Sequence, residues 1–193
     1  MERLVKKFEQ RYRRARCHLA TWSDLQSRLL KQFSNAASIL DRLPVLGEVE
    51  NYGILKEVKS MAQVLPASQI ESFEKILSSI HSTLGEMEII SKSLEKLWCD
   101  GTQLLKSEKP TRQQAQQWLG AQPSLNVCID GLHSLYTMHH DEYMLKVAIV
   151  KALSYNSRSE DMAALQSVLS DQPNIPPDEV QHIFDVIAAG DVW

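Results

Sequence analysis

The hydrophobic positions of the first forty residues recur every seven residues on two interleaved tracks. This pattern is typical of one long helix that buries a continuous seam. Further apolar residues at Leu25, Leu30 and Ile39 widen the stripe, which favours a bundle of several helices over a bare two-stranded coiled coil. We predict that Pro44 ends this helix. The two tracks are Val5, Tyr12, Leu19, Gln26, Phe33 and Leu40, and Phe8, Ala15, Trp22, Leu29, Ala36 and Leu43.

A second long helix is predicted from Ser68 to about residue 108. Before it lies a short helical stretch with Leu55, Val58, Ala62 and Leu65, which we expect Pro66 to interrupt. Ser68 and Glu71 have the spacing of a capping box at a helix start. Two helices of nearly equal length, joined by a reversing segment, predict an antiparallel pair. The apolar rows of this helix run through Ile70, Leu77, Leu84, Trp98 and Leu105, and through Phe73, Ile80, Met87 and Leu94.

The segment Lys109-Pro110-Thr111 predicts a boundary. We divide the chain into residues 1–109, a helical pair forming a coiled-coil arm, and residues 110–193, a C-terminal helical region whose main helix spans 124–155. Short helices are expected from Ser159 and from Asp178. Strand-like alternation of useful length is absent from the sequence. The predicted fold is therefore all-α: an elongated antiparallel helical bundle with coiled-coil seams and short C-terminal helices.

Composition narrows the class of protein. With 44% hydrophobic residues and only 7 Gly and 7 Pro among 193 residues, the chain is neither disordered nor collagen-like. Its three cysteines, Cys17, Cys99 and Cys128, are widely spaced and odd in number, which suggests reduced thiols in the cytosol or nucleus. Apolar stretches all stay well short of about 18 residues, so we expect neither secretion nor membrane insertion.

Charge is distributed unevenly along the chain. Residues 1–16 carry seven basic and two acidic side chains, whereas residues 159–193 carry seven acidic side chains and no Lys or Arg. Clustered cations can neutralise the phosphates of RNA or DNA. A solvated helix face and a nuclear targeting signal are the alternatives. The candidate nucleic-acid contacts are Lys6, Lys7, Arg11, Arg13, Arg14 and Arg16.

Catalytic patterns are not found in the sequence. It contains neither a glycine-rich phosphate loop nor a GxSxG motif. His139 and His140 are adjacent, so on a helix they point about 100° apart and cannot share a metal ion. Cys17 lies among basic residues, but a second residue to complete a catalytic arrangement is missing. We expect no enzymatic activity, no cofactor and no metal site.

Tryptophans are the remaining candidates for binding. Trp22, Trp98 and Trp118 lie on or beside helical seams and are more readily explained as core residues. Trp193 follows a short acidic helix and has few neighbours to pack against. Because Trp is favoured at the centres of interfaces, Trp193 is a candidate anchor for a groove on another protein.

The segment from Met138 to Leu153 resembles the C-terminal helix of the cyclin-dependent-kinase-2-interacting protein family. A Trp-x-x-Leu pair at Trp22 and Leu25, and the turn Gln172-Pro173-x-Ile175, are similar to further features of that family. The resemblance is sound over about residues 138–187 and schematic elsewhere. The matching residues in the helix are Met138, Glu142, Leu145, Lys146, Ile149, Lys151 and Leu153.

This resemblance implies a small helical protein that acts without catalysis. The family's members are subunits of a nuclear and cytoplasmic assembly built on a type II AAA+ ATPase, tied to maturation of the large ribosomal subunit, DNA replication and genome stability. We therefore expect an adaptor that links the ATPase to its substrate particle and forms a hetero-oligomer with a helical sister subunit. Candidate partner-binding residues are Trp22, Leu25, Glu142, Leu145, Lys146, Ile149, Lys151, Leu153 and Trp193.

Two other classes of protein remain open at this point. One is a coiled-coil subunit of a cytoskeletal or vesicle-tethering complex, which long apolar seams also fit. The other is a helical enzyme, which would require a ligand or metal between its helices. Identification of the partners distinguishes an adaptor from a tethering subunit, because only the adaptor binds an AAA+ ATPase.

Overall fold

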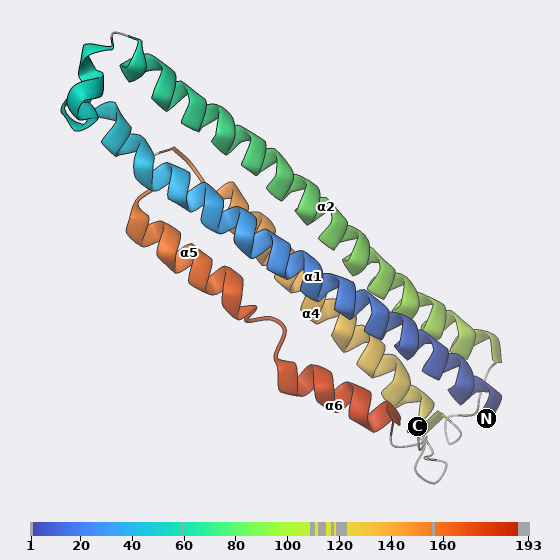
Figure 1. Ribbon diagram of the computed structural model, residues 1–193. Coiled ribbons are helices and arrows are strands. Elements are labelled where there is room, and N and C mark those ends of the chain that lie inside the picture. The colour runs from blue at the N-terminus through green and yellow to red at the C-terminus, as the bar shows by residue number, and fades with distance from the viewer. Residues whose placement is uncertain are drawn as a thin grey trace. The chain divides into compact units, whose positions relative to one another are not determined.

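The computed structural model describes residues 2–58, 60–108, 111, 115–116, 118, 123–155 and 157–188. Across these residues the chain is helical and contains no strand, which confirms the all-α fold (Figure 1). Within the described ranges, no helix combines the length and the apolar character needed to cross a membrane. The elements are α1 (Glu2–Gly47), the 3₁₀ helix η1 (Val49–Glu57), α2 (Met61–Glu108), α4 (Leu125–Lys151), α5 (Ser159–Asp171) and α6 (Pro177–Ala188).

The chain forms two compact units. Unit 1 comprises Met1–Asp24, Met87–Met144 and Gln172–Trp193, and unit 2 comprises Leu25–Glu86 and Leu145–Asp171. Helices α1, α2 and α4 each contribute one part to each unit, whereas α5 belongs to unit 2 and α6 to unit 1. The predicted boundary at residue 109 lies outside the described residues, so the division into an arm and a C-terminal region stays a prediction.

In unit 1, α1 and α2 run antiparallel. Lys7 near the start of α1 pairs with Glu108 at the end of α2, with 3.4 Å between Nζ and Oε1. Farther along α1, Arg11 donates to the carbonyl of Asp100 at 3.4 Å. A Cβ added to Gly101 would lie 3.1 Å from the ring of Phe8, so the glycine lets the two helices approach closely. The buried core of unit 1 includes Val5, Phe8, Tyr12, Ala15, Met87, Leu94, Leu132, Leu135 and Phe184.

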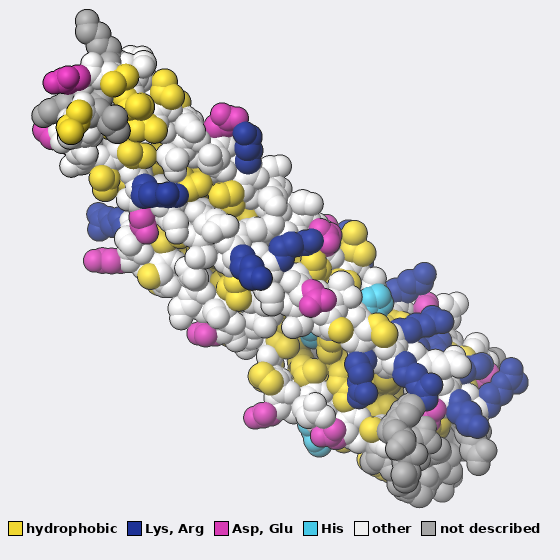
Figure 2. All heavy atoms as spheres, viewed as in Figure 1, with side chains coloured by type: hydrophobic (Ala, Val, Ile, Leu, Met, Phe, Trp, Pro, Cys, Tyr) yellow, Lys and Arg dark blue, Asp and Glu magenta, His cyan; other side chains and the backbone are white. Residues whose placement is uncertain are grey.

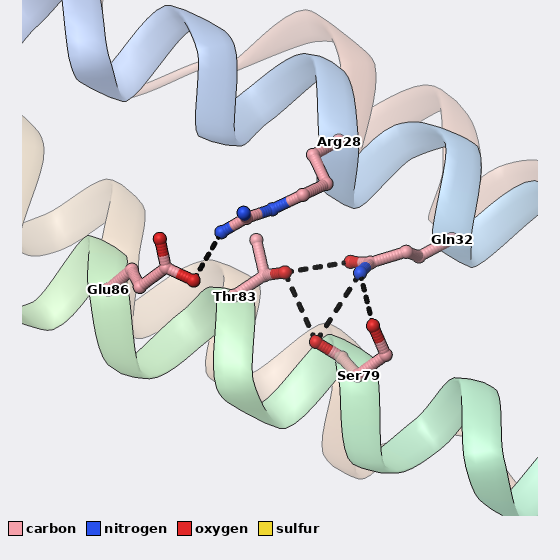
Figure 3. A network of polar contacts seen from close by, with 5 residues as sticks. All are labelled: Arg28, Gln32, Ser79, Thr83 and Glu86. Carbon is pink, nitrogen blue, oxygen red and sulfur yellow. Dashed lines mark hydrogen bonds and ion pairs between the residues drawn. The ribbon is translucent and has the colours of Figure 1, made fainter.

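In unit 2, the second half of α1 packs antiparallel to the first half of α2. A polar network along this contact links Arg28 to Glu86 and Gln32 to Ser79 and Thr83 (Figure 3). The Thr83 hydroxyl donates to the Gln32 side chain at 2.9 Å. Both predicted heptad tracks are buried here up to Leu40, which confirms the seam. The core includes Leu29, Phe33, Ala36, Leu40, Phe73, Ile80, Leu84 and Leu169.

Gln26, a polar residue on the predicted seam, is buried in unit 2. Its Nε2 donates to the backbone carbonyl of Leu169 in the last turn of α5, at 2.7 Å. That carbonyl would normally accept from the N–H four residues later, but residue 173 is a proline and has none. Gln26 therefore supplies the donor that the end of α5 lacks.

Two prolines do not act as predicted. Pro44 lies inside α1, which continues to Gly47, and Pro66 lies inside α2, which begins at Met61 and not at Ser68. A proline removes one backbone donor, and near a helix end the hydrogen bonds on either side of it can still form. The predicted helix with Leu55, Val58, Ala62 and Leu65 is correspondingly divided between the residues before α2 and its first turns.

Helices α4, α5 and α6 begin where the sequence predicts them, within one or two residues. At the start of α4, the hydroxyl of Ser124 accepts from the backbone N–H of Val127 at 3.3 Å, which is an N-cap interaction. Acidic residues occupy the first turns of α5 and α6, where they complement the helix dipole.

Candidate functional site

The basic residues at the start of α1 fall into two groups. Arg3, Lys6, Arg13, Arg14 and Arg16 are exposed, whereas Lys7 and Arg11 are half-buried. Steps of three and four residues separate Arg3, Lys6, Gln10, Arg13 and Arg14, so these positions share one face of the helix. We call Arg3, Lys6, Arg13 and Arg14 the basic face. Lys and Arg side chains gather over this part of α1 (Figure 2).

Lys7 and Arg11 hold helices together. Besides its bond to Asp100, Arg11 donates to the backbone carbonyl of Lys7 at 2.9 Å. Burial lowers the pKa of Arg11, although an arginine remains charged at neutral pH. Of the six candidate nucleic-acid contacts, Lys7 and Arg11 are therefore half-buried, and Lys6, Arg13, Arg14 and Arg16 are exposed.

A pocket of about 280 Å³ lies between α1 and α6 in unit 1. The rings of Tyr12 and Phe184 meet edge to face in it, with 6.0 Å between centroids. The guanidinium of Arg16 lies over the Phe184 ring, 4.9 Å from its centroid. We call this the α1–α6 pocket. Its lining residues are Glu9, Tyr12, Arg13, Arg16, Phe184, Ile187 and Ala188.

An aromatic row follows the contact between α2 and α4 in unit 1. Trp98 of α2 stacks nearly parallel to Tyr136 of α4, with 5.9 Å between centroids, and lies 4.5 Å from the ring of His133. His140 continues the row, 5.5 Å from Tyr136. His133 is exposed and the other three residues are half-buried. We call these four residues the aromatic row. All four residues stay partly accessible to solvent, and Nδ1 of His140 lies 3.4 Å from the Ser91 hydroxyl.

The helix that resembles the partner-binding family is largely internal. Glu142 and Lys146 are fully buried, and Ile149 is buried as well. The Glu142 carboxylate accepts two hydrogen bonds from Asn174, one from its backbone N–H and one from its side chain, both at 3.2 Å. Glu142 thus anchors the turn before α6. Of the remaining candidates on α4 and just after it, Leu145 and Leu153 are half-buried and Lys151 is exposed.

Trp22 anchors the same turn. Its indole N–H donates to the side-chain oxygen of Gln172 at 2.9 Å, and its ring meets His139 edge to face at 5.0 Å. Gln172 adopts a positive φ of 46°, a backbone conformation that few non-glycine residues take. Leu25, the second residue of the Trp-x-x-Leu pair, is buried in unit 2. Trp193 lies outside the described residues.

Sequence reasoning did not predict the contacts that complete these sites, although it singled out the turn at Gln172. Gln172, Asn174 and Phe184 are distant in sequence from Trp22, Glu142 and Arg16, and their pairing depends on how the helices pack. The signal for Gln172 and Asn174 is the turn composition of Gln172-Pro173-Asn174 before two further prolines.

Among the described residues, no group of three or more His, Cys, Asp or Glu side chains is placed to hold a metal ion. The three cysteines are free thiols, with Cys17 and Cys99 exposed and Cys128 buried. Burial, with a smaller contribution from the Glu9 carboxylate, raises the pKa of Cys128 to about 12. A thiol in that environment is protonated at neutral pH and is a poor nucleophile.

Unit 2 exposes apolar side chains near the turn between α1 and α2. Ile54 in η1 is 90% exposed, and other apolar residues on either side of it in the sequence are also open to solvent. Such a concentration is more than scattered single residues on an ordinary surface. The exposed apolar residues here are Val45, Val49, Ile54, Val58, Val64 and Ile70.

Comparison with known proteins gives a family assignment. No curated protein matches the chain. One family model, described as ribosome biogenesis protein C1orf109-like, matches residues 2–192. Its name implies a role in ribosome biogenesis, in agreement with the ribosomal part of the resemblance, and it differs from the family that residues 138–153 resemble. Because the match covers nearly the whole sequence, the chain belongs to the family of C1orf109-like ribosome biogenesis proteins.

Proposed function

We propose that this protein is a non-catalytic adaptor in maturation of the large ribosomal subunit, which links a type II AAA+ ATPase to its substrate particle. The observation that carries the proposal is that unit 1 exposes two recognition chemistries, the aromatic row and the basic face. The first suits a protein partner and the second suits a phosphate-rich one. Family membership supports the ribosomal setting.

The aromatic row is the proposed contact for a helical sister subunit. Aromatic side chains are enriched at the centres of protein interfaces because they bury a large area with few rotatable bonds. Trp98 and Tyr136 are already stacked against each other, so little side-chain entropy is lost when a partner covers them. On unit 2, the accessible Leu145, Lys151 and Leu153 are proposed as further partner contacts.

The basic face is proposed to contact ribosomal RNA on the particle. Residues 3 to 14 cover about 16 Å along the helix at about 1.5 Å per residue. A cationic stripe of that length can meet several phosphates of one strand. The protein would then work in the nucleus, where the particle is built, and in the cytoplasm, where its maturation ends. A role in DNA replication and genome maintenance is the finer expectation from the resemblance.

Affinity purification of the full chain from cells, followed by mass spectrometry, tests this proposal. We expect an AAA+ ATPase, a helical sister subunit and large-subunit ribosomal proteins to co-purify. A Trp98→Ala, Tyr136→Ala variant should lose the sister subunit and remain folded by circular dichroism, and a Val64→Ala variant serves as the control. Recovery of coiled-coil tethering subunits with no ATPase would refute the adaptor role.

A further inference from the structure

We propose that a pocket between α1 and α2 in unit 1 binds one backbone phosphate of RNA through Arg11 and Arg14. We call it the α1–α2 pocket. The inference rests on the RNA contact of the proposed function and deepens it, because it names the site that takes a single phosphate. It also gives a binding role to Arg11, which is not part of the basic face.

The α1–α2 pocket has a volume of about 280 Å³ and an excess of positive charge. Lys7, Gln10, Arg11 and Arg14 line it from α1. Steps of three and four residues separate these positions, so they share one side of the helix. Asp100 lines the pocket from α2. Three cations against one carboxylate leave two positive charges, so the pocket attracts an anion.

Arg11 is the donor whose position the fold fixes. Its guanidinium donates to the backbone carbonyl of Lys7 at 2.9 Å and to that of Asp100 at 3.4 Å. A guanidinium carries five N–H donors in a planar fork, so further donors remain for a ligand. Because the two carbonyls already hold the side chain in place, it loses little conformational entropy when it binds an anion.

Arg11 and Arg14 are close enough for their charges to repel each other. Burial lowers the pKa of Arg11, the Asp100 carboxylate opposes this shift, and the charge of Arg14 adds to it. A phosphate between the two guanidinium groups would remove the repulsion and accept charge-assisted hydrogen bonds from both. Arg14 is exposed, so its long side chain is free to turn toward such a ligand.

The size and position of the pocket favour a phosphate on an RNA strand. Its volume equals about nine water molecules at about 30 Å³ each, which is room for one phosphate group and its nearest waters. Arg14 belongs both to the pocket and to the basic face, so a strand bound to that face passes the pocket. A phosphoserine on a protein partner carries a similar anionic group, and the experiment distinguishes this source.

Titration of the full chain with inorganic phosphate tests the pocket without RNA. The Nε–H signals of the arginines are followed by NMR, and the Arg11 signal is the one that Arg11→Lys removes. We expect a saturable shift of this signal that sodium chloride at equal ionic strength does not produce. Arg14→Gln should weaken phosphate binding about fivefold or more, because it removes a charged hydrogen-bond donor.

Arg13→Gln is the matched control. Arg13 is exposed and adjacent to Arg14 in sequence, but it lines the α1–α6 pocket instead. The two variants change the net charge equally, so only Arg14→Gln should weaken the response of Arg11 to phosphate. Circular dichroism spectra and urea midpoints confirm that each variant is folded. Equal losses in the two variants, or equal responses to phosphate and chloride, would overturn the proposal.

An RNA hairpin and a phosphoserine peptide distinguish the two sources of phosphate. We expect the hairpin to shift the Arg11 signal, and Arg14→Gln to weaken hairpin binding more than Arg13→Gln does. A shift with the phosphoserine peptide alone would show that the pocket serves a modified protein and would refute the RNA assignment. If the hairpin binds but leaves the Arg11 signal unchanged, the pocket is excluded while the RNA contact of the basic face stands. Absence of hairpin binding would refute both.

Discussion

The hydroxyl of Tyr12 donates a hydrogen bond to the backbone carbonyl of Cys128 across 2.8 Å. The contact joins α1 to α4 in the core of unit 1, and Tyr12 is 3% exposed. It requires a glycine nearby, because a Cβ on Gly131 would lie 2.3 Å from the Tyr12 hydroxyl and 3.1 Å from Ile183 of α6. Three helices therefore meet at a position that has room only for a hydrogen atom.

A Gly131→Ala substitution should destabilise the protein, although alanine favours helices by about 1 kcal/mol over glycine. The added methyl group must displace the Tyr12 hydroxyl, and overpacking of this kind costs about 1–3 kcal/mol. Gly85→Ala in α2 is the matched control, since nothing lies within 4 Å of its Cβ position. Urea unfolding should show a net loss of up to about 2 kcal/mol for the first variant and a gain of up to about 1 kcal/mol for the second. Equal effects would contradict the close approach at Gly131.

Alkaline pH should lower the free energy of unfolding through Cys128. Burial raises the pKa of its thiol in the folded state to about 12. The unfolded chain loses this proton above about pH 9, while the folded chain keeps it. Stability is therefore fully present below that pH and falls by about 1.4 kcal/mol per pH unit as the pH rises toward 12. Burial also raises the pKa of Tyr12, which adds to the decline at higher pH.

Variants of the cysteines isolate this effect. The decline between about pH 8.5 and pH 10.5, measured by urea unfolding, should be shallower for Cys128→Ala than for the wild type. The exposed cysteines provide controls, and Cys17→Ala and Cys99→Ala should keep the wild-type slope. An unchanged slope in Cys128→Ala would show that another group controls the alkaline transition.

A Gln26→Glu substitution should destabilise unit 2 at neutral pH by about 3 kcal/mol, because it removes the donor to Leu169 and buries a carboxylate beside a carbonyl oxygen. The folded-state pKa of the new carboxyl group would be raised, so its penalty is absent at low pH and appears as the pH rises through the unfolded value of about 4.3. Gln63→Glu, exposed in the first turn of α2, is the control. Thermal unfolding at about pH 3.5 and about pH 7 should show convergence with the wild type only at the lower pH.

Binding of an RNA hairpin should depend on the basic face and on salt. Reversing Arg3, Lys6 and Arg14 to glutamate should weaken binding more than about tenfold at about 0.1 M salt. It should also reduce the slope of log affinity against log salt by about 0.7–0.9 for each phosphate that the protein no longer neutralises. The control variant replaces Lys31, Lys96 and Lys151 with glutamate. These lysines are exposed elsewhere on the protein, and their replacement changes the net charge by the same amount. Equal weakening in both variants would indicate general attraction and not a defined binding face.

Periodicity predicted the parts of the fold that depend on local pattern. The heptad seam of α1, the start of α4 at Ser124 and the acidic starts of α5 and α6 follow from residue spacing, capping and helix dipoles. Pro44 and Pro66 were interpreted as helix breaks because their position relative to the helix ends was unknown. The cost of a proline depends on that position, which the sequence alone does not give.

The candidate sites were less predictable. The composition of residues 1–16 indicates a basic cluster. It does not indicate that Arg14 is exposed while Arg11 bonds to the Asp100 carbonyl, because that depends on where α2 packs against α1. Likewise, the α1–α6 pocket requires α6 to lie beside the start of α1. Residues more than 160 positions apart in the chain form it, and spacing along the sequence does not record such a contact.

Glu142 shows how similarity between protein families should be interpreted. Its carboxylate is committed to Asn174, and the residue is wholly enclosed by the protein itself. In this chain the glutamate fastens a loop, so a match at this position is not by itself evidence of a binding surface. If partner contacts were chosen only from residues that match another family, the choice would include buried side chains that no partner can reach. Exposed residues such as Lys151 should therefore be tested first as partner contacts.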